Sequence, residues 1–273
     1  MGKQLPENSR KFLAVDIGNT HTVLGLFGAR TMLDSWRIPT RKETTGEELF
    51  SLLTPLLATR NVSLKDLDTL LVSSVVPPAA EAWADMSVKF PGPVFQDAHE
   101  IALELVKISY PHPHEVGTDR LLNSLAAFRR YETSCIVVDY GTATTFDCVS
   151  EKGEYLGGVI APGILLAARG LFSGTSKLPL VKFPRQKISP LGKSTETAIQ
   201  AGLLYGFAGL TDNIIENLKR VFEKRPLVVS TGGLSPVLFD YCKTVDRLEP
   251  QLTMEGLLCC HDHLEKMAQN PDS

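Results

Sequence analysis

Two aspartates with similar neighbours occur in this chain, 123 residues apart. The first opens the run Asp16-Ile17-Gly18-Asn19-Thr20, and the second opens Asp139-Tyr140-Gly141-Thr142-Ala143. The glycine two residues after each aspartate permits a sharp turn that brings backbone N–H groups close to an anion. A carboxylate repels a phosphate, so we expect each aspartate to hold a cation, or a water on a cation, beside it. Two such turns facing each other predict a clamp for a polyphosphate.

Other short polar and glycine residues extend this pattern. Asn19, Thr20 and Thr22 carry side chains that can reach phosphate oxygens. The run Thr231-Gly232-Gly233 follows an apolar segment and offers the flat, close backbone approach that suits a nucleotide. Any one of these turns alone is more typical of an ordinary Asp-Gly or Gly-Gly loop. Together, in this order and at strand ends, they favour a nucleotide site.

An acid and a guanidinium stand side by side between the two turns, at Asp119 and Arg120. Such a carboxylate can accept the proton of an attacking hydroxyl, while the guanidinium steadies a substrate or a transferring phosphate. The alternative is that Asp119 caps a helix over residues 120–131 and that Arg120 is solvated, and spacing alone slightly favours this alternative. The Gly192-Lys193-Ser194 run resembles the end of a P-loop, but Lys187 occupies the position of its first glycine.

The elements that must position these residues occur in two similar series. Apolar runs predict strands, and wider apolar spacing predicts helices. The first series has strands at 12–15, 22–27, 31–38, 67–76 and 93–96 with a helix at 44–59; the second has strands at 135–138, 144–149, 155–160 and 227–230 with a helix at 195–222. Two tandem units of the same plan predict a duplicated α/β fold with a cleft between its halves.

The composition excludes several classes of protein. The 28 Lys plus Arg and 31 Asp plus Glu leave a net charge of −3, which argues against a nucleic-acid binder with a concentrated basic face. No apolar run approaches the roughly 18 residues that span a bilayer, and residues 1–10 lack a secretory apolar region. We expect a cytoplasmic protein with no nucleic-acid or membrane partner. The run Cys259-Cys260-His261-Asp262-His263 lies in a predicted helix, whose adjacent residues point apart, and this disfavours a zinc site.

These motifs together resemble those of the type III pantothenate kinases, from about residue 12 to residue 260. The similar segments are Asp16–Thr22, Ser74–Pro77, Gly117–Arg120 with Asn123, Asp139–Thr145, Gly157–Gly163, Ala198–Gly209 and Thr231–Gly233. The resemblance implies a duplicated actin-like ATPase (ribonuclease H-like) fold with domains at 11–116 and 117–265 and a nucleotide cleft between them, working as a homodimer. It implies transfer of the γ-phosphoryl group of ATP to the primary hydroxyl of pantothenate, giving 4′-phosphopantothenate in the first step of coenzyme A biosynthesis.

The resemblance also implies a role for each matching residue. Asp119 would be the general base, Asp16 would hold Mg²⁺ through a water, and Asp139 would bind a monovalent cation, K⁺ or NH₄⁺. The pantothenate site would comprise Tyr110, Gly117, Thr118, Asp119, Arg120 and Thr195. The ATP site would comprise Asp16, Ile17, Gly18, Asn19, Thr20, His21, Thr22, Val23, Thr142, Gly232 and Gly233. Ser194 stands before Thr195 where the family usually has Asn.

Two other functions remain open at this point. The chain can be a non-catalytic regulatory or accessory relative that keeps the fold, although such a relative would be expected to have lost one of Asp16, Asp119 and Asp139. It can also be another kinase or phosphatase of this fold that acts on a sugar or on polyphosphate.

Overall fold

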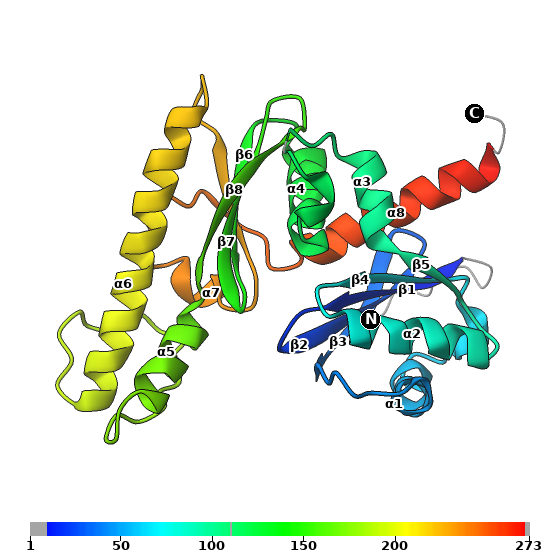
Figure 1. The fold of residues 1–273 in the computed structure, drawn as a ribbon, viewed down its shortest axis with the longest axis horizontal. Coiled ribbons are helices and arrows are strands. Elements are labelled where there is room, and N and C mark those ends of the chain that lie inside the picture. Colours follow the sequence, from blue (N-terminus) through cyan, green and yellow to red (C-terminus); the bar gives the residue numbers. More distant parts are fainter. Residues whose placement is uncertain (1–9, 110, 271–273) are drawn as a thin grey trace. The chain divides into compact units, whose positions relative to one another are not determined.

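The computed structural model of the chain describes residues 10–109 and 111–270. By compactness the chain forms two units, each shown in Figure 1. Of the described residues, unit 1 comprises 10–105, 114–122 and 253–270, and unit 2 comprises 106–109, 111–113 and 123–252. The division into domains at 11–116 and 117–265 stays a prediction. None of the helices formed by the described residues is both long and apolar enough to span a bilayer.

Unit 1 contains a five-stranded sheet in the order β3-β2-β1-β4-β5. Its strands are β1 (Lys11–Ile17), β2 (His21–Gly28), β3 (Thr31–Pro39), β4 (Thr69–Ser74) and β5 (Val94–Asp97). The first three strands form an antiparallel meander, while β4 pairs parallel to β1 and β5 pairs parallel to β4. The carboxyl ends of β1, β4 and β5 therefore lie along one edge of the sheet.

Unit 2 repeats this plan strand for strand, in the order β10-β9-β6-β7-β8. Its strands are β6 (Cys135–Tyr140), β7 (Ala143–Val149), β8 (Tyr155–Pro162), β9 (Leu227–Thr231) and β10 (Arg247–Leu248). Again the first three strands are antiparallel, and β9 and β10 add in parallel beside β6. The predicted duplication of an α/β unit is confirmed by this matching strand order.

One face of the unit 1 sheet is covered by α1 (Gly46–Ala58) and α2 (Pro77–Lys89). Apolar side chains of these helices, including Leu53 and Trp83, pack against strand residues such as Leu13 in a single buried cluster. The strand predicted over 67–76 is shorter than expected because Pro77 starts α2, where its missing N–H costs no helical hydrogen bond. This helix layer fixes the sheet whose edge carries Asp16.

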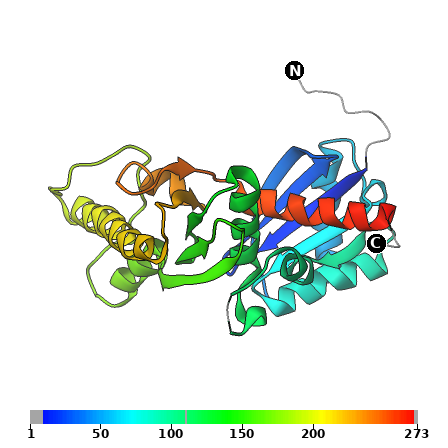
Figure 2. The same ribbon diagram turned by 90° about the horizontal axis from the view of Figure 1, so that it is seen from above.

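The other face of the unit 1 sheet contacts α8 (Leu252–Gln269), which Figure 2 shows running beside β1 and β2. His261 stacks on Phe12 with ring centroids 3.7 Å apart. Gly25 makes room for the Met254 sulfur, because a Cβ added at Gly25 would lie 3.0 Å from that atom. The predicted helix through Cys259–His263 is thus confirmed, and one of its histidines is a packing residue.

Ligand-type atoms of His261, Asp262 and Glu265 on α8 lie within 4.8 Å of one another. Two of these residues already have cationic partners in unit 1. Asp262 forms an ion pair with Arg30, and Glu265 lies 3.8 Å from Arg10. Among the described residues, the tail cysteines Cys259 and Cys260 are not members of this group.

In unit 2, α5 (Ile164–Ser173) and α6 (Thr195–Leu218) cover one face of the sheet. Ile164 and Leu204 belong to the same buried cluster as Val138 of β6. Besides α3 (Ala98–Leu105) and α4 (Thr118–Tyr131), four short elements complete the helical content of the described chain. They are α7 (Ser235–Leu238) and the 3-10 turns Leu64–Asp66, Pro113–Glu115 and Lys219–Val221.

The opposite face of the unit 2 sheet packs against α4 (Thr118–Tyr131), whose residues from 123 onward belong to this unit. Ala126 and Ala127 of α4 share a buried cluster with Val137 of β6 and Val229 of β9. Asp139 follows Val137 by two residues and therefore points to the same face. The sequence pattern predicts this helix, but the alternative in which Asp119 caps it is wrong, because Asp119 lies inside the first turn.

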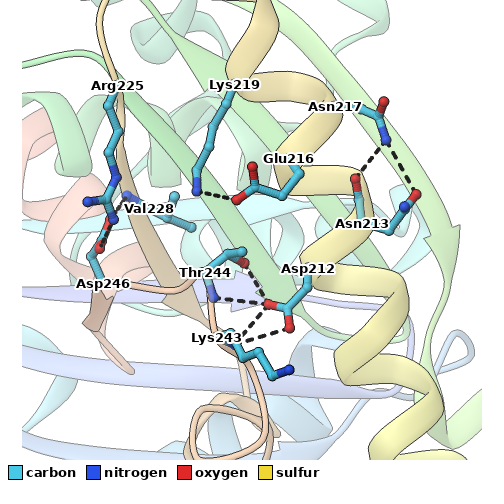
Figure 3. A network of polar contacts seen from close by, with 10 residues as sticks. All are labelled: Asp212, Asn213, Glu216, Asn217, Lys219, Arg225, Val228, Lys243, Thr244 and Asp246. Atoms are coloured by element: carbon cyan, nitrogen blue, oxygen red, sulfur yellow. Dashed lines mark hydrogen bonds and ion pairs between the residues drawn. The ribbon is translucent and has the colours of Figure 1, made fainter.

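Polar contacts tie α6 to the chain that leads into β10 (Figure 3). The Asp212 carboxylate accepts hydrogen bonds from the Lys243 backbone N–H at 2.9 Å and from the Thr244 hydroxyl at 2.7 Å. Asp246 then accepts a hydrogen bond from the Val228 backbone N–H at 3.0 Å. These contacts hold β9 and its neighbouring segment in place, and β9 ends at the glycine pair of the predicted nucleotide site.

Candidate active site

Asp16 lies one residue before the end of β1, on the carboxyl edge of the unit 1 sheet. The parallel pairing places Ser73 of β4 beside it, and the Ser73 hydroxyl donates a hydrogen bond to Asp16 Oδ1 at 3.2 Å. Ser73 is fully buried. The carboxylate therefore has a fixed orientation at the strand end, as the sequence predicts for a residue that holds a cation.

The turn that follows Asp16 is closed by its own backbone and by Thr40. The Gly18 N–H donates to the His21 carbonyl at 3.1 Å. The Thr40 hydroxyl donates to the Gly18 carbonyl at 2.7 Å and lies 2.9 Å from the Thr22 hydroxyl. Asn19 is exposed at the tip. This arrangement leaves a rigid, polar turn of the kind that can cradle a phosphate.

Asp119 lies in the first turn of α4, and its electrostatic environment is shared with Asp16. Burial raises the pKa of the Asp119 carboxyl, although a hydrogen bond from the Arg120 backbone N–H, at 2.9 Å to Oδ1, and the Arg120 charge oppose the rise. The pKa of Asp16 is raised to about 7, first by burial and then by the charge of Asp119, while the bond from Ser73 opposes this. Two acids in one partly buried site of unit 1 repel each other.

Gly117 makes the placement of Asp119 possible. A Cβ added at Gly117 would lie 2.7 Å from Asp119 Oδ1. The Gly117 carbonyl also accepts the first helical hydrogen bonds of α4, from Arg120 at 3.1 Å and from Leu121 at 3.2 Å. A side chain at position 117 would thus push the carboxylate away from the helix start.

A cavity of about 470 Å³ adjoins this part of unit 1. It opens beside the ends of β4 and β5 and the start of α4, and its lining includes Ser74, Asp97, His99, Gly117 and Thr118. The crevice at the carboxyl ends of parallel strands is the usual ligand site in open α/β sheets. Gly117 and Thr118, both predicted to contact pantothenate, therefore line a cavity large enough for a small molecule.

In unit 2, Asp139 occupies the position that matches Asp16. It pairs across β7 with Thr145 and lies beside Thr231 of the parallel strand β9. The Asn123 side-chain amide donates to Asp139 Oδ2 at 3.0 Å. In the described chain the hydroxyl of Thr231 is buried without a hydrogen-bond partner. An oxygen-rich corner with an unsatisfied buried hydroxyl fits a hard cation, which prefers oxygen ligands.

Gly232 packs directly against this aspartate. Its φ of +90° is a conformation that L side chains rarely adopt, and an added Cβ would lie 2.2 Å from Asp139 Oδ1. The next residue, Gly233, is exposed. On the other side, Gly163 at the end of β8 lies against the turn at residues 141–142, where an added Cβ would meet the Thr142 carbonyl at 2.2 Å. Glycines thus surround the Asp139 turn closely, and Thr142 itself is exposed at its tip.

The remaining predicted site residues are placed individually. Thr195 is the first residue of α6 in unit 2 and is exposed. The Ser194 hydroxyl caps that helix by accepting a hydrogen bond from the Thr197 N–H at 3.2 Å, a role that Asn fills equally well. Ile17 is buried and Val23 partly buried in their strands, where their side chains support the sheet. Tyr110 lies outside the described residues.

Three residues of the site were not predicted as functional from the sequence. Ser73 is the hydroxyl partner of Asp16, Thr40 braces the first turn, and His99 contacts Thr118 beside Asp119. Each is an ordinary polar residue whose role depends on a partner 19 to 57 residues away in sequence. A repeat alignment of β4 with β9 would have suggested Ser73, since it matches Thr231 by register.

The repeated five-stranded sheet, with an aspartate at the same turn of each half, assigns the chain to the actin/Hsp70/sugar-kinase fold class. Solved structures agree with this fold. A Baf family transcriptional activator from Campylobacter jejuni is 18% identical with a TM-score of 0.58, covering 93% of this chain and 100% of the other. An inorganic polyphosphate/ATP-glucomannokinase from Arthrobacter sp. strain KM is 11% identical with a TM-score of 0.50, covering 94% and 99%.

The sequence comparisons narrow this class to one family. The model of the type III pantothenate kinase family matches residues 12–217. A type III pantothenate kinase from Desulfatibacillum aliphaticivorans is 39% identical over 254 residues, which are 92% of this chain and 98% of the relative. Another from Syntrophotalea carbinolica is 43% identical over 248 residues, covering 90% and 96%. This chain belongs to the type III pantothenate kinase family.

Proposed function

We propose that this protein transfers the γ-phosphoryl group of ATP to the primary hydroxyl of pantothenate, giving 4′-phosphopantothenate for coenzyme A biosynthesis. The observation that carries the proposal is the cavity of unit 1 lined by Gly117 and Thr118, beside the start of α4 that carries Asp119. Membership of the type III pantothenate kinase family supports pantothenate as the acceptor of the phosphoryl group.

Asp119 is the general base of this proposal. Its carboxylate accepts the hydroxyl proton of pantothenate as the oxygen attacks the γ-phosphorus, and the bond to the leaving ADP oxygen breaks. Burial raises its pKa, which makes the carboxylate a better proton acceptor than an exposed aspartate. Arg120, Gly117, Thr118 and Thr195 are proposed to hold the pantothenate, together with Tyr110, which lies outside the described residues.

ATP is held by the two turns in this proposal. Residues 16–23 bind its phosphates, with Thr142 of the second turn, and Gly232 and Gly233 receive the nucleoside. Mg²⁺ bound through water at Asp16 would neutralise charge on the phosphates. The residues fit such an ion, because burial first, and then the charge of Asp119, raises the pKa of Asp16 to about 7 without it. A divalent cation relieves this repulsion.

The second turn is proposed to hold a monovalent cation, K⁺ or NH₄⁺, at Asp139. The support is the oxygen-donor corner of Asp139 and the buried Thr231 hydroxyl, for which the described residues offer no hydrogen-bond partner. Asp139, which accepts a hydrogen bond from a neutral amide, carries less negative charge than Asp16 and Asp119 together. This lower charge suits a cation of lower charge.

A homodimer is also part of this proposal. Unit 2 exposes large apolar side chains on β8, on α5 and on the loop after α5, and we expect them to contribute to an interaction surface. Its members are Ile160, Leu165, Leu166, Leu171, Phe172, Leu180 and Leu191. Helix α6 adds Gly202, Gly206 and Gly209, where an added Cβ would meet no atom within 4 Å. A second copy of the chain would cover these groups. A cytoplasmic location accords with the odd number of cysteines, five, whose spacing matches no disulfide framework.

ADP release by the purified protein with ATP and Mg²⁺ tests the proposed function, with and without pantothenate. We expect release that depends on pantothenate, with simple sugars and polyphosphate as inactive controls. Turnover with a sugar but not with pantothenate would assign a different acceptor to the same fold. ATP binding without turnover on any acceptor would favour the accessory function over catalysis.

A further inference from the structure

The hydroxyl of Thr118 is held by a histidine from another part of unit 1. Thr118 is the first residue of α4 and only 4% exposed, and its Oγ1 lies 3.1 Å from His99 Nδ1. Either atom can be the donor, depending on which ring nitrogen carries the proton. His99 therefore contacts the residue immediately before Asp119.

His99 is itself firmly placed. It is the second residue of α3 (Ala98–Leu105), which starts directly after β5. The Asp97 carboxylate accepts a hydrogen bond from the His99 backbone N–H at 2.8 Å and so holds the first turn of α3. Ala98, between them, is fully buried. The imidazole thus extends from a strand end of the sheet to the start of α4.

The start of α4 requires an anchor of this kind. Gly117 has no Cβ, so the backbone that delivers Asp119 gains no side-chain packing at that position, and glycine is the most flexible residue in a chain. Asp119 is held by the Arg120 N–H of its own turn, a contact that moves with the helix start. The His99–Thr118 contact connects the turn to β5 and α3 across 19 residues of sequence.

We propose that His99 is a positioning residue for Asp119, acting through the Thr118 hydroxyl. This inference rests on the proposed function, in which Asp119 is the general base. The His99–Thr118 hydrogen bond fixes the first turn of α4 against the sheet edge that carries Asp16, and so sets the direction of the Asp119 carboxylate. Catalytic groups must be held within about 0.5 Å of their productive position, so the loss of one anchor lowers the rate of the chemical step.

Four substitutions isolate the hydrogen bond from the side-chain volume. His99→Leu and Thr118→Val remove the bonding atoms while keeping apolar bulk. His99→Asn keeps a polar atom near the position of Nδ1, and Thr118→Ser keeps the hydroxyl. Steady-state kcat and the KM values for ATP and pantothenate are measured for each variant in the full-length protein, at a temperature well below its melting point.

We expect kcat to fall at least about 10-fold in His99→Leu and Thr118→Val, with the KM for ATP within about 2-fold of wild type. His99→Asn and Thr118→Ser recover most of kcat. The kcat of the double variant His99→Leu/Thr118→Val is no lower than that of the less active single variant, because both changes break the same contact. This pattern separates positioning from general destabilisation, which would not be rescued by the polar replacements.

Three results would overturn the inference. The first is a kcat in His99→Leu within 2-fold of wild type. The second is an equal loss in His99→Leu and His99→Asn, and the third is losses that multiply in the double variant. Wild-type protein that shows no pantothenate-dependent turnover would instead refute the proposed function, and the inference with it.

Discussion

The Asp16 and Asp139 turns occupy the same position in two repeated sheets, yet their surroundings differ. Each aspartate lies one residue before the end of the first strand, beside a parallel strand whose partner residue carries a hydroxyl. In unit 1 that hydroxyl, on Ser73, donates to Asp16. In unit 2 the matching Thr231 has a buried hydroxyl without a partner in the described chain, and Asn123 donates to Asp139 instead.

The charge of the two corners differs as well. Asp16 has a second acid, Asp119, close enough to raise its pKa, whereas Asp139 has the neutral amide of Asn123. The repeated plan thus contains two copies of one Asp-X-Gly turn, and side chains from other elements give each copy a different electrostatic character. We infer that the site of Asp16 and Asp119 binds the divalent cation and contains the base, and that the Asp139 site binds the monovalent cation.

The largest effect is expected for Asp119→Asn. The amide cannot accept the hydroxyl proton, so turnover falls by a factor on the order of 10² or more, while ATP binding stays largely intact. Rates of phosphopantothenate formation and nucleotide titrations measure the two quantities. Glu249→Gln, a change at a carboxylate of unit 2 that bonds Tyr131, is the control. Near-normal turnover in Asp119→Asn would remove this residue from the base role.

The next effect concerns the backbone around Asp139. Gly232→Ala places a Cβ against Asp139 and forces a positive φ on an L residue, so we expect a loss of about 2 to 4 kcal/mol in the free energy of unfolding. Gly18→Ala, in the turn after Asp16, is the comparison, because the added Cβ there meets its nearest atom at 3.2 Å. Denaturant unfolding should rank Gly232→Ala as far more harmful. Equal losses would show that the two glycines are packed alike.

The raised pKa of the Asp16 carboxyl leads us to expect an unusual dependence of stability on pH. Its folded-state pKa is about 7 against an ordinary value of 3.8, so between these values the folded protein holds a proton that the unfolded chain has released. Stability from this group is present below about pH 4 and is lost as the pH rises through 7. Asp16→Asn removes the buried charge and should stabilise the protein without Mg²⁺ at pH 8, by at most about 4 kcal/mol.

Thermal melts of both proteins across pH 4 to 8, without Mg²⁺ or nucleotide, measure this difference. The gap between Asp16→Asn and wild type should grow with pH and close near pH 4. A gap that does not change with pH would show that Asp16 is ionised throughout.

The smallest effects on stability are expected for the two hydroxyl residues beside the aspartates, Ser73 and Thr231. Ser73→Ala removes a hydrogen bond to the Asp16 carboxylate and should cost about 1 kcal/mol at pH 8. Thr231→Val removes a buried hydroxyl that has no partner in the described chain, so stability should be unchanged or slightly higher without K⁺. Thr231→Ser is the control that keeps the hydroxyl. A clear loss in Thr231→Val alone would reveal a hydrogen bond at that position.

Much of the fold could be predicted from the sequence because buried strands are short apolar runs. The runs at residues 12–15 and 135–138 become β1 and β6, and the glycines that follow mark both turns. The helix over 44–59 was also predictable, since Thr45 and Glu48 form a capping box at its start. Local pattern is sufficient where neighbours in sequence decide the structure.

The site was harder to predict where distant residues decide it. Asp119 was expected to cap its helix on spacing alone, but Gly117 allows it to lie inside the first turn. Ser73 and His99 gain their importance from strand register and helix placement, which no local pattern contains. The pKa of Asp16 likewise depends on an acid 103 positions away in sequence.

The most direct test of the central claim is a cation titration of phosphopantothenate formation in wild type, Asp16→Asn and Asp139→Asn. The account predicts that wild type needs K⁺ or NH₄⁺ and is not supported by Na⁺. It predicts that Asp139→Asn loses this activation while keeping a saturable dependence on Mg²⁺, and that Asp16→Asn requires far more Mg²⁺. Full K⁺ activation in Asp139→Asn, or no K⁺ requirement in wild type, would contradict the assignment of different cations to the two turns.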